Sequence, residues 1–399
     1  MGANLANAFV RDLGYEVRVV SFFKSGAKPF YPLDSRVSCV YLCTSSAKGK
    51  NALINLFHKT LFRAWLCLKV HKIATQSDII LANDGWFVPL FRDRARFFVR
   101  LWHLNAPKRA RKKLRLYDAL VILSGREMGR WQRYHSNIKI IPNFLPTIPQ
   151  VATNHSQKVV LSVGRMSSEK GFLRLIDIWK VVRDRIACHT ERSEVSKSHE
   201  SKINNESMTQ ERMGESHRFA QSQQIVGDSQ VAKMDSSLSA KAQNDNMAND
   251  LREWKLIIVG DGVLKGEIQS KIHALNLGES VLLKPFTKDI EREYLGASIY
   301  AMASHFEGFG MVLAEASSYE LPCIAFDIAT GPSDIIEHNK SGFLIADNDL
   351  ESYADKLITL MSDESMRVRF GSEAKKIVEQ RFSKEVVLQK WADLFRIRA

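Results

Sequence analysis

Short runs of β-branched and apolar residues alternate with stretches of helical spacing along most of the chain. The first series of candidate strands lies between residues 16 and 146 and reads EVRVVSFF, RVSCVYL, DIILAND, RFFVRLWH, DALVILS and IKIIPN. A second series follows residue 157 and reads KVVLSVGR, KLIIVGDG, VLLKPF, SIYAMAS, PCIAFD and GFLIA. Strands that alternate with helices predict parallel sheets covered by helices. The fold class is therefore α/β, with two doubly wound, Rossmann-like domains facing a central cleft.

Two prolines and several small polar residues interrupt this pattern over residues 144–158, where we expect the hinge. The expected domains are residues 1–150 and 151–380, and residues 381–399 form a terminal helix that packs back on the first domain. Residues 187–250 are rich in Ser, Gln, Asn, Glu and Lys and predict a disordered insertion within the second domain. A tolerated surface loop explains this insertion more simply than a regulatory arm.

Charge is unevenly distributed over the 399 residues. The chain has a formal net charge of +13, and residues 1–150 hold 25 basic and 8 acidic side chains. Such asymmetry indicates an anionic partner for the first half. Its basic residues gather between Lys108 and Arg115, and residues 51–72 place large apolar residues at helical spacing. One interpretation is a peripheral surface for anionic membranes, and the other is a core helix beside solvated charges. Zinc-finger spacing and aromatic RNA-binding motifs are absent, so no nucleic acid is expected.

The five cysteines form no C-x-x-C pair, which fits a reducing compartment. The N-terminal residues do not read as a secretory signal, and no run of 18 apolar residues occurs. We therefore expect a cytoplasmic protein whose membrane contact, if any, is peripheral on the inner face of the cytoplasmic membrane.

The strongest local motif is VGRMSSEKG, in which a buried strand is followed by Gly164, Arg165 and then Lys170 before a helix. Free amides at a helix start favour anions, and the two cations could clamp a diphosphate. Ordinary solvated charges near a helix start explain the motif equally well.

A second motif, EGFGMVLAE, begins at Glu307 and ends at Glu315. Its glycines leave a loop whose backbone can approach a ligand closely, and helical character follows. A carboxylate at the position of Glu315 can accept two hydrogen bonds from a ribose diol.

These two motifs, with VGDG at 259–262 and GPSDIIEHNKSGFLI at 331–345, resemble the motif set of family-4 glycosyltransferases. That family comprises retaining nucleotide-sugar enzymes of GT-B fold, and the resemblance covers the chain outside the insertion. It implies transfer of a hexose or N-acetylhexosamine from a nucleotide-diphosphate sugar, UDP-sugar foremost, to a cell-envelope glycan. Lipopolysaccharide and lipid-linked oligosaccharides are the acceptors that it suggests.

The resemblance also implies roles for individual residues. Gly164, Arg165, Lys170, Glu315 and the loop Gly308, Phe309, Gly310 and Met311 would bind the donor, and Glu307 and His103 would be catalytic. A lone histidine at a strand end is also explained by a structural role. No cofactor or metal is expected, because Asp347-Asn348-Asp349 is better explained by helix capping.

One departure from the family is the start of the chain, where the usual first strand and glycine-rich loop are missing. Two explanations are open: the true start lies upstream of Met1, or the chain is a truncated copy. The alternative hypothesis is accordingly an inactive remnant that only binds nucleotide-sugar or membrane.

Overall fold

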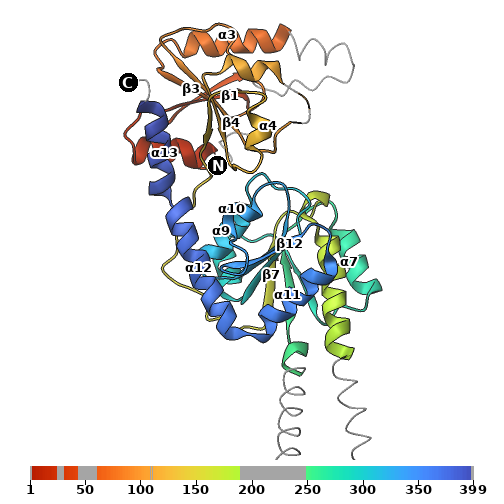
Figure 1. The fold of residues 1–399 in the computed structure, drawn as a ribbon. Coiled ribbons are helices and arrows are strands. Elements are labelled where there is room, and N and C mark those ends of the chain that lie inside the picture. The colour runs from red at the N-terminus through yellow and green to blue at the C-terminus, as the bar shows by residue number, and fades with distance from the viewer. Residues whose placement is uncertain are drawn as a thin grey trace, which may run out of the picture.

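The computed structural model describes residues 2–24, 31–43, 61–107, 109, 111–188 and 249–396. These residues form an N-terminal and a C-terminal α/β region, linked by the chain near residue 150 and by two C-terminal helices (Figure 1). Of the predicted insertion, residues 189–248 lie outside the described residues.

The N-terminal region contains two parallel sheets. One pairs β1 with β2, and the other has the strand order β3-β4-β5-β6. Its strands are β1 (Arg18–Phe23), β2 (Ser38–Cys43), β3 (Ile79–Ala82), β4 (Phe97–Trp102), β5 (Ala119–Ile122) and β6 (Ile138–Ile140). Its helices are α1 (Gly2–Arg11), α3 (Arg63–Ile73), the 3-10 helix η2 (Lys112–Leu116) and α4 (Met128–Trp131).

The C-terminal region is built on one parallel sheet of six strands in the order β12-β11-β10-β7-β8-β9. The strands are β7 (Val159–Val163), β8 (Lys255–Val259), β9 (Val281–Lys284), β10 (Ile299–Met302), β11 (Cys323–Asp327) and β12 (Gly342–Ala346). This is the doubly wound Rossmann order, in which the direction of winding reverses between β7 and β10. Polar side chains that follow these two strands should therefore meet at one place.

Helices cover both faces of the C-terminal sheet. The helix over 172–188 and the apolar sides of α7 and α11 pack on one face, and α9, α10 and α12 pack on the other. The helices are α7 (Lys265–Ala274), α8 (Ile290–Leu295), α9 (Met311–Ser318), α10 (Pro332–Ile335), α11 (Leu350–Ser362), α12 (Glu364–Phe382) and α13 (Lys384–Arg396). The 3-10 turn η3 (Ser168–Lys170) precedes the helix over 172–188.

The predicted strand positions are confirmed, since each of the twelve apolar runs contains one strand of the structure. The α/β fold class with parallel sheets is confirmed as well. In the described part of the chain, no helix has the length and apolar character needed to cross a membrane.

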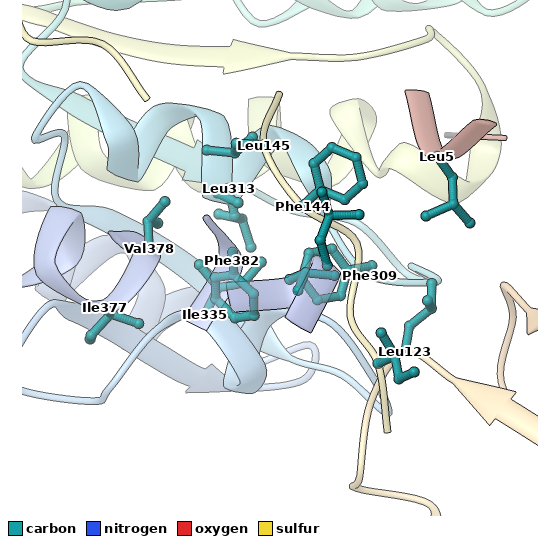
Figure 2. Close-up of a cluster of buried hydrophobic side chains, with 14 of the residues drawn as sticks. Leu5, Leu123, Phe144, Leu145, Phe309, Leu313, Ile335, Ile377, Val378 and Phe382 are labelled. Atoms are coloured by element: carbon teal, nitrogen blue, oxygen red, sulfur yellow. The ribbon is translucent and has the colours of Figure 1, made fainter. Parts of the chain in front are cut away.

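One hydrophobic cluster is continuous across the two regions. It joins Leu5 of α1 and Leu123 after β5 to Phe309, Leu313 and Phe382 of the C-terminal region. Figure 2 shows these side chains together around the connecting segment. Burial of shared apolar surface favours the observed arrangement of the two regions over a separated one.

Helix α13 leaves the C-terminal sheet and packs on α1. The ring of Phe9 contacts Trp391 and Phe395 edge to face, at centroid distances of 5.7 and 5.5 Å. At the start of α13, Lys384 pairs with Asp12 at 2.7 Å. The C-terminal helix thereby fixes the first helix of the chain.

The segment after the connection is anchored by a buried arginine. The carbonyl of His155 accepts hydrogen bonds from Nε and Nη2 of Arg367 at 3.2 and 3.0 Å. Nη1 of Arg367 donates to the last carbonyls of α11, those of Leu360 and Met361. His155 is itself buried with a positive φ of 56°, and its Nδ1 finds no partner in the part of the chain that is described.

We expect stability to fall as the pH drops below the ordinary pKa of histidine, about 6.5. Burial, and next the charge of Arg367, lower the pKa of His155 in the folded protein. Between the folded pKa and 6.5 the unfolded chain binds more protons, so acid favours unfolding there. His155→Asn, which tolerates positive φ, should flatten the dependence of Tm on pH in this range. The exposed His273 on α7 gives the control His273→Asn, and an unchanged slope in His155→Asn would contradict the assignment.

Candidate functional site

The loops after β7 and β10 meet at the point where the winding of the sheet reverses. Gly171 follows η3 with a φ of +65°, and a Cβ atom there would lie 1.8 Å from the carbonyl oxygen of Ala303. The amide of His305 donates to the carbonyl of Glu169 at 2.8 Å. Only a glycine permits this approach, which brings the VGRMSSEKG motif beside the residues after β10.

Lys170 and Glu307 come together in this place. Their Nζ and Oε1 atoms are 2.6 Å apart, and the hydroxyl of Ser304 donates to the same carboxylate oxygen at 2.7 Å. Glu307 is buried, whereas Lys170 is partly exposed. Arg165 is not drawn into this pair, because its side chain is 74% exposed and lies 3.8 Å from Glu169.

A glycine loop and the start of α9 follow Glu307. Gly310 has a φ of +83° and is the last residue before the helix, which begins at Met311. Within the described residues, the amides from Gly308 to Val312 donate no hydrogen bond. Successive free amides beside a helix N-terminus form an anion-binding nest. Gly164 lies beside Lys170, since a Cβ atom there would touch the Lys170 side chain at 3.6 Å.

Glu315 lies in the second turn of α9 and is held from one side. Its Oε2 accepts a hydrogen bond from the hydroxyl of Tyr294 at 3.1 Å. Tyr294 is buried and stacks on Tyr319 with 5.2 Å between the ring centroids. Burial raises the pKa of Glu315, and the Tyr294 hydrogen bond opposes that rise. The other carboxylate oxygen has no partner in the described chain and is free for a ligand.

His103 follows β4 and approaches the glycine loop from the N-terminal region. A Cβ atom on Gly308 would lie 2.0 Å from the carbonyl oxygen of His103, so glycine is required at this contact. The His103 Nε2 and Asn83 Oδ1 atoms are 2.5 Å apart. Burial, and next the charge of Arg100, lower the pKa of His103, which favours the neutral ring.

Further polar contacts join the two regions near His103 and the glycine loop. Arg126 pairs with Asp327, and the side chains of Asn105 and Thr330 are hydrogen-bonded. Thr330 also donates to the carbonyl of Glu307 at 2.7 Å. The position of Glu307 is thus coupled to the N-terminal region.

A buried arginine supports the loop after β10. Arg174 donates through Nε to the carbonyl of Ala303 at 2.6 Å and through Nη1 to Asp347 at 2.8 Å. The neighbouring Asp349 is the N-cap of α11 and accepts from the amide of Ser352 at 3.0 Å. The capping interpretation is therefore confirmed for Asp349. Among the residues that the structure describes, no group of three or more His, Cys, Asp or Glu side chains could hold a metal ion.

Sequence reasoning missed three partners of the site: Ser304, Asn83 and Tyr294. The first two carry a detectable signal, because each is polar and directly follows an apolar run that predicts a strand. Tyr294 carries none, since its hydroxyl reaches Glu315 only through the packing of α8 beside α9.

Comparison with known proteins gives a family match and full-length relatives. Residues 235–377 match the family model "Glycosyl transferases group 1". A poly(ribitol-phosphate) alpha-N-acetylglucosaminyltransferase of Staphylococcus aureus is 36% identical over 141 residues, which cover 35% of this chain and 29% of that protein. The amylovoran biosynthesis glycosyltransferase AmsD of Erwinia amylovora is 25% identical over 416 residues, covering 98% of this chain and 94% of AmsD.

Solved structures show the fold. That of Anabaena HepE in complex with UDP and glucose matches with a TM-score of 0.60 at 17% identity, covering 96% of this chain and all of HepE. Two Rossmann-like regions whose strand ends face each other, as they do here at the contact between His103 and Gly308, define the GT-B class of proteins. Residues 235–377 thus match the group 1 glycosyltransferases, the family that the motifs of the chain resemble. The chain spans less than a third of the length of the S. aureus relative.

Proposed function

We propose that the chain transfers a hexose or N-acetylhexosamine from a nucleotide-diphosphate sugar, with UDP-sugar as the foremost donor, to a cell-envelope glycan. The acceptors that we propose are lipopolysaccharide and lipid-linked oligosaccharides. The observation that carries the proposal is the Lys170–Glu307 pair at 2.6 Å beside the free amides of the glycine loop. The relatives named for amylovoran biosynthesis and for N-acetylglucosaminyl transfer support the class of product.

The geometry suits a donor diphosphate at the start of α9. Breaking the sugar–phosphate bond places negative charge on the leaving diphosphate, and Lys170 with the amides of residues 308–312 would stabilise that charge. Arg165 is exposed on the same loop, and a change of its side-chain rotamer would bring it to the phosphates. The free oxygen of Glu315 would accept hydrogen bonds from the ribose diol.

We propose a retaining, metal-independent reaction. Glu307 is tied to Lys170 and Ser304, so it orients the site and is unsuited to attack the sugar as a free nucleophile. Front-face displacement, in which the leaving phosphate takes the proton of the acceptor hydroxyl, fits this arrangement. His103, with its ring held by Asn83, would contact the transferred sugar and the acceptor.

The test is release of free nucleotide diphosphate from a panel of nucleotide-sugars, with and without a chelator. Turnover that is insensitive to the chelator supports the proposal and identifies the donor. Calorimetric binding of UDP without turnover, in the presence of envelope glycans as acceptors, would overturn transfer and favour a protein that only binds nucleotide-sugar.

We also propose contact with an anionic membrane surface through the first part of α3 and the residues before it. Leu61, Trp65 and Leu68 are exposed, and the ammonium of Lys69 lies 4.0 Å from the ring centroid of Trp65. The core interpretation is therefore wrong for Leu61 and Trp65, whereas residues 51–60 lie outside the described chain. An apolar row with basic neighbours suits the interface of an anionic bilayer, which co-sedimentation with vesicles tests.

A further inference from the structure

A buried arginine in the N-terminal region has unused hydrogen-bond donors. Arg100 lies on β4, two positions before its end, and is only 7% exposed. Its Nη1 donates to the carbonyl of Ala82 at 2.9 Å. Its Nε and Nη2 find no partner in the described residues, yet neither is sealed from solvent. A guanidinium offers five N–H donors, so most of the capacity of this buried cation is free for a ligand.

The groups around Arg100 do not neutralise it. Those that face it are Arg63, Asp84, Arg111 and Tyr117. The Asp84 carboxylate accepts the amides of its own turn, at residues 86 and 87. The Tyr117 hydroxyl donates to the carbonyl at residue 87. Burial, opposed only in part by these groups, lowers the pKa of Arg100. A desolvated cation with so little local compensation favours an external anion.

A second arginine shares the surroundings of Arg100. The guanidinium carbons of Arg100 and Arg111 lie 5.4 and 5.2 Å from the ring centroid of Trp102. Arg111 is exposed and makes no ion pair with any described residue. The positive charge of Arg111 helps to lower the pKa of Arg100, so the two guanidinium groups repel each other. An oxyanion bound to both would offset that repulsion. Paired arginines hold phosphate oxygens through directed N–H bonds.

This cluster lies beside the candidate site and is distinct from the donor nest. Trp102 donates through Nε1 to the carbonyl of Asn105 at 3.2 Å, and the side chain of Asn105 contacts Thr330. His103 follows Trp102 and packs against Gly308. An anion on Arg100 and Arg111 would therefore approach the glycine loop from the N-terminal side, the side that the donor diphosphate does not occupy.

We propose that Arg100 and Arg111, placed around Trp102, form a second anion site that binds a phosphate group of the acceptor. Only the assignment to the acceptor rests on the proposed function. The shared ligand chemistry is a phosphate ester, from either a phosphodiester-linked polymer or the diphosphate of a lipid-linked sugar. Exposed basic residues around Arg111, which form no ion pair with any other described residue, would concentrate either of them near the site. They are Arg109, Lys112 and Lys113.

The test is calorimetric titration of inorganic pyrophosphate into the full chain saturated with UDP, which removes the donor nest from competition. Arg111→Gln should weaken pyrophosphate binding by about tenfold, since it removes one of two directed cations. Arg115→Gln, which removes an exposed charge from the same run, should change it by less than about twofold because salt screens exposed charges. Arg100→Gln should weaken it as well, and the exposed Arg111 keeps the test valid if that variant fails to fold.

Equal affinity in Arg111→Gln and the parent protein, or absence of binding to the UDP-saturated protein, would overturn the proposal. An unchanged UDP affinity in Arg111→Gln separates this site from the donor site. If UDP itself does not bind, the proposed function fails, while pyrophosphate binding that depends on Arg111 would still support the anion site.

Competition then identifies the source of the phosphate. Displacement of pyrophosphate by a soluble glycerol-phosphate oligomer assigns a phosphodiester polymer. Displacement only by a prenyl diphosphate in detergent micelles assigns a lipid-linked diphosphate. Displacement by neither would overturn the assignment to the acceptor.

Discussion

Lys170→Met is expected to lower the rate of sugar transfer by about 10²- to 10³-fold, the usual cost of removing one preorganised group that stabilises developing negative charge. We expect this role for Lys170 because its Nζ is held 2.6 Å from Glu307 beside the amides of the glycine loop. The measurement is kcat for nucleotide diphosphate release with a saturating donor. Parent-like activity in this variant would remove Lys170 from the site.

The same substitution also leaves a buried carboxylate without its cation. Among the described residues, Glu307 would retain only the Ser304 hydroxyl and the contacts of its backbone, so stability should fall by on the order of 1–3 kcal/mol. Adding Glu307→Gln should restore Tm without restoring activity, which distinguishes loss of chemistry from loss of fold.

A matched control is available in the same region. Lys271 of α7 pairs with Asp177 at 2.6 Å, the same distance as the Lys170 pair, but lies away from the glycine loop. Lys271→Met should leave kcat within about twofold, because exposed ion pairs contribute little. A comparable loss in this variant would show that the effect of Lys170→Met is not specific to the site.

The fold was predictable because its signal is local. Each strand is a run of three to six residues whose apolar character stands out against helical neighbours, and the order of the runs implies parallel pairing. No single apolar run predicts the strand order β12-β11-β10-β7-β8-β9, but this order follows from the doubly wound pattern. The glycines at 171, 308 and 310 were visible as turn signals, although their contacts were not.

The residues of the candidate site could be predicted from the sequence, but the contacts between them could not. Lys170 and Glu307 stand 137 positions apart, and their contact depends on how close the loops after β7 and β10 come. The exposure of Arg165 depends likewise on loop geometry, since its motif equally suited a clamp. The basic run around Arg111 was conspicuous in the sequence, whereas Arg100 was hidden inside an apolar strand. Periodicity places a residue in an element, but the direction of a charged side chain depends on tertiary packing.

Gly308→Ala is expected to reduce kcat/KM by about 10²-fold, because a displacement of about 1 Å of reacting groups costs that much. The added Cβ atom would lie 2.0 Å from the carbonyl oxygen of His103, and both partners of this clash are backbone. The two regions must therefore separate at this contact, which moves His103 away from the glycine loop. The affinity for UDP should change much less, since Lys170, Glu315 and the helix start remain on the C-terminal side.

Gly266→Ala in α7 is the matched control, because among the described residues no atom outside its own helix lies within 4 Å of the added methyl group. Steady-state kinetics with calorimetric UDP binding make the measurement, and a Gly308→Ala enzyme with the parent kcat/KM would show that the His103 contact is not part of the reacting arrangement.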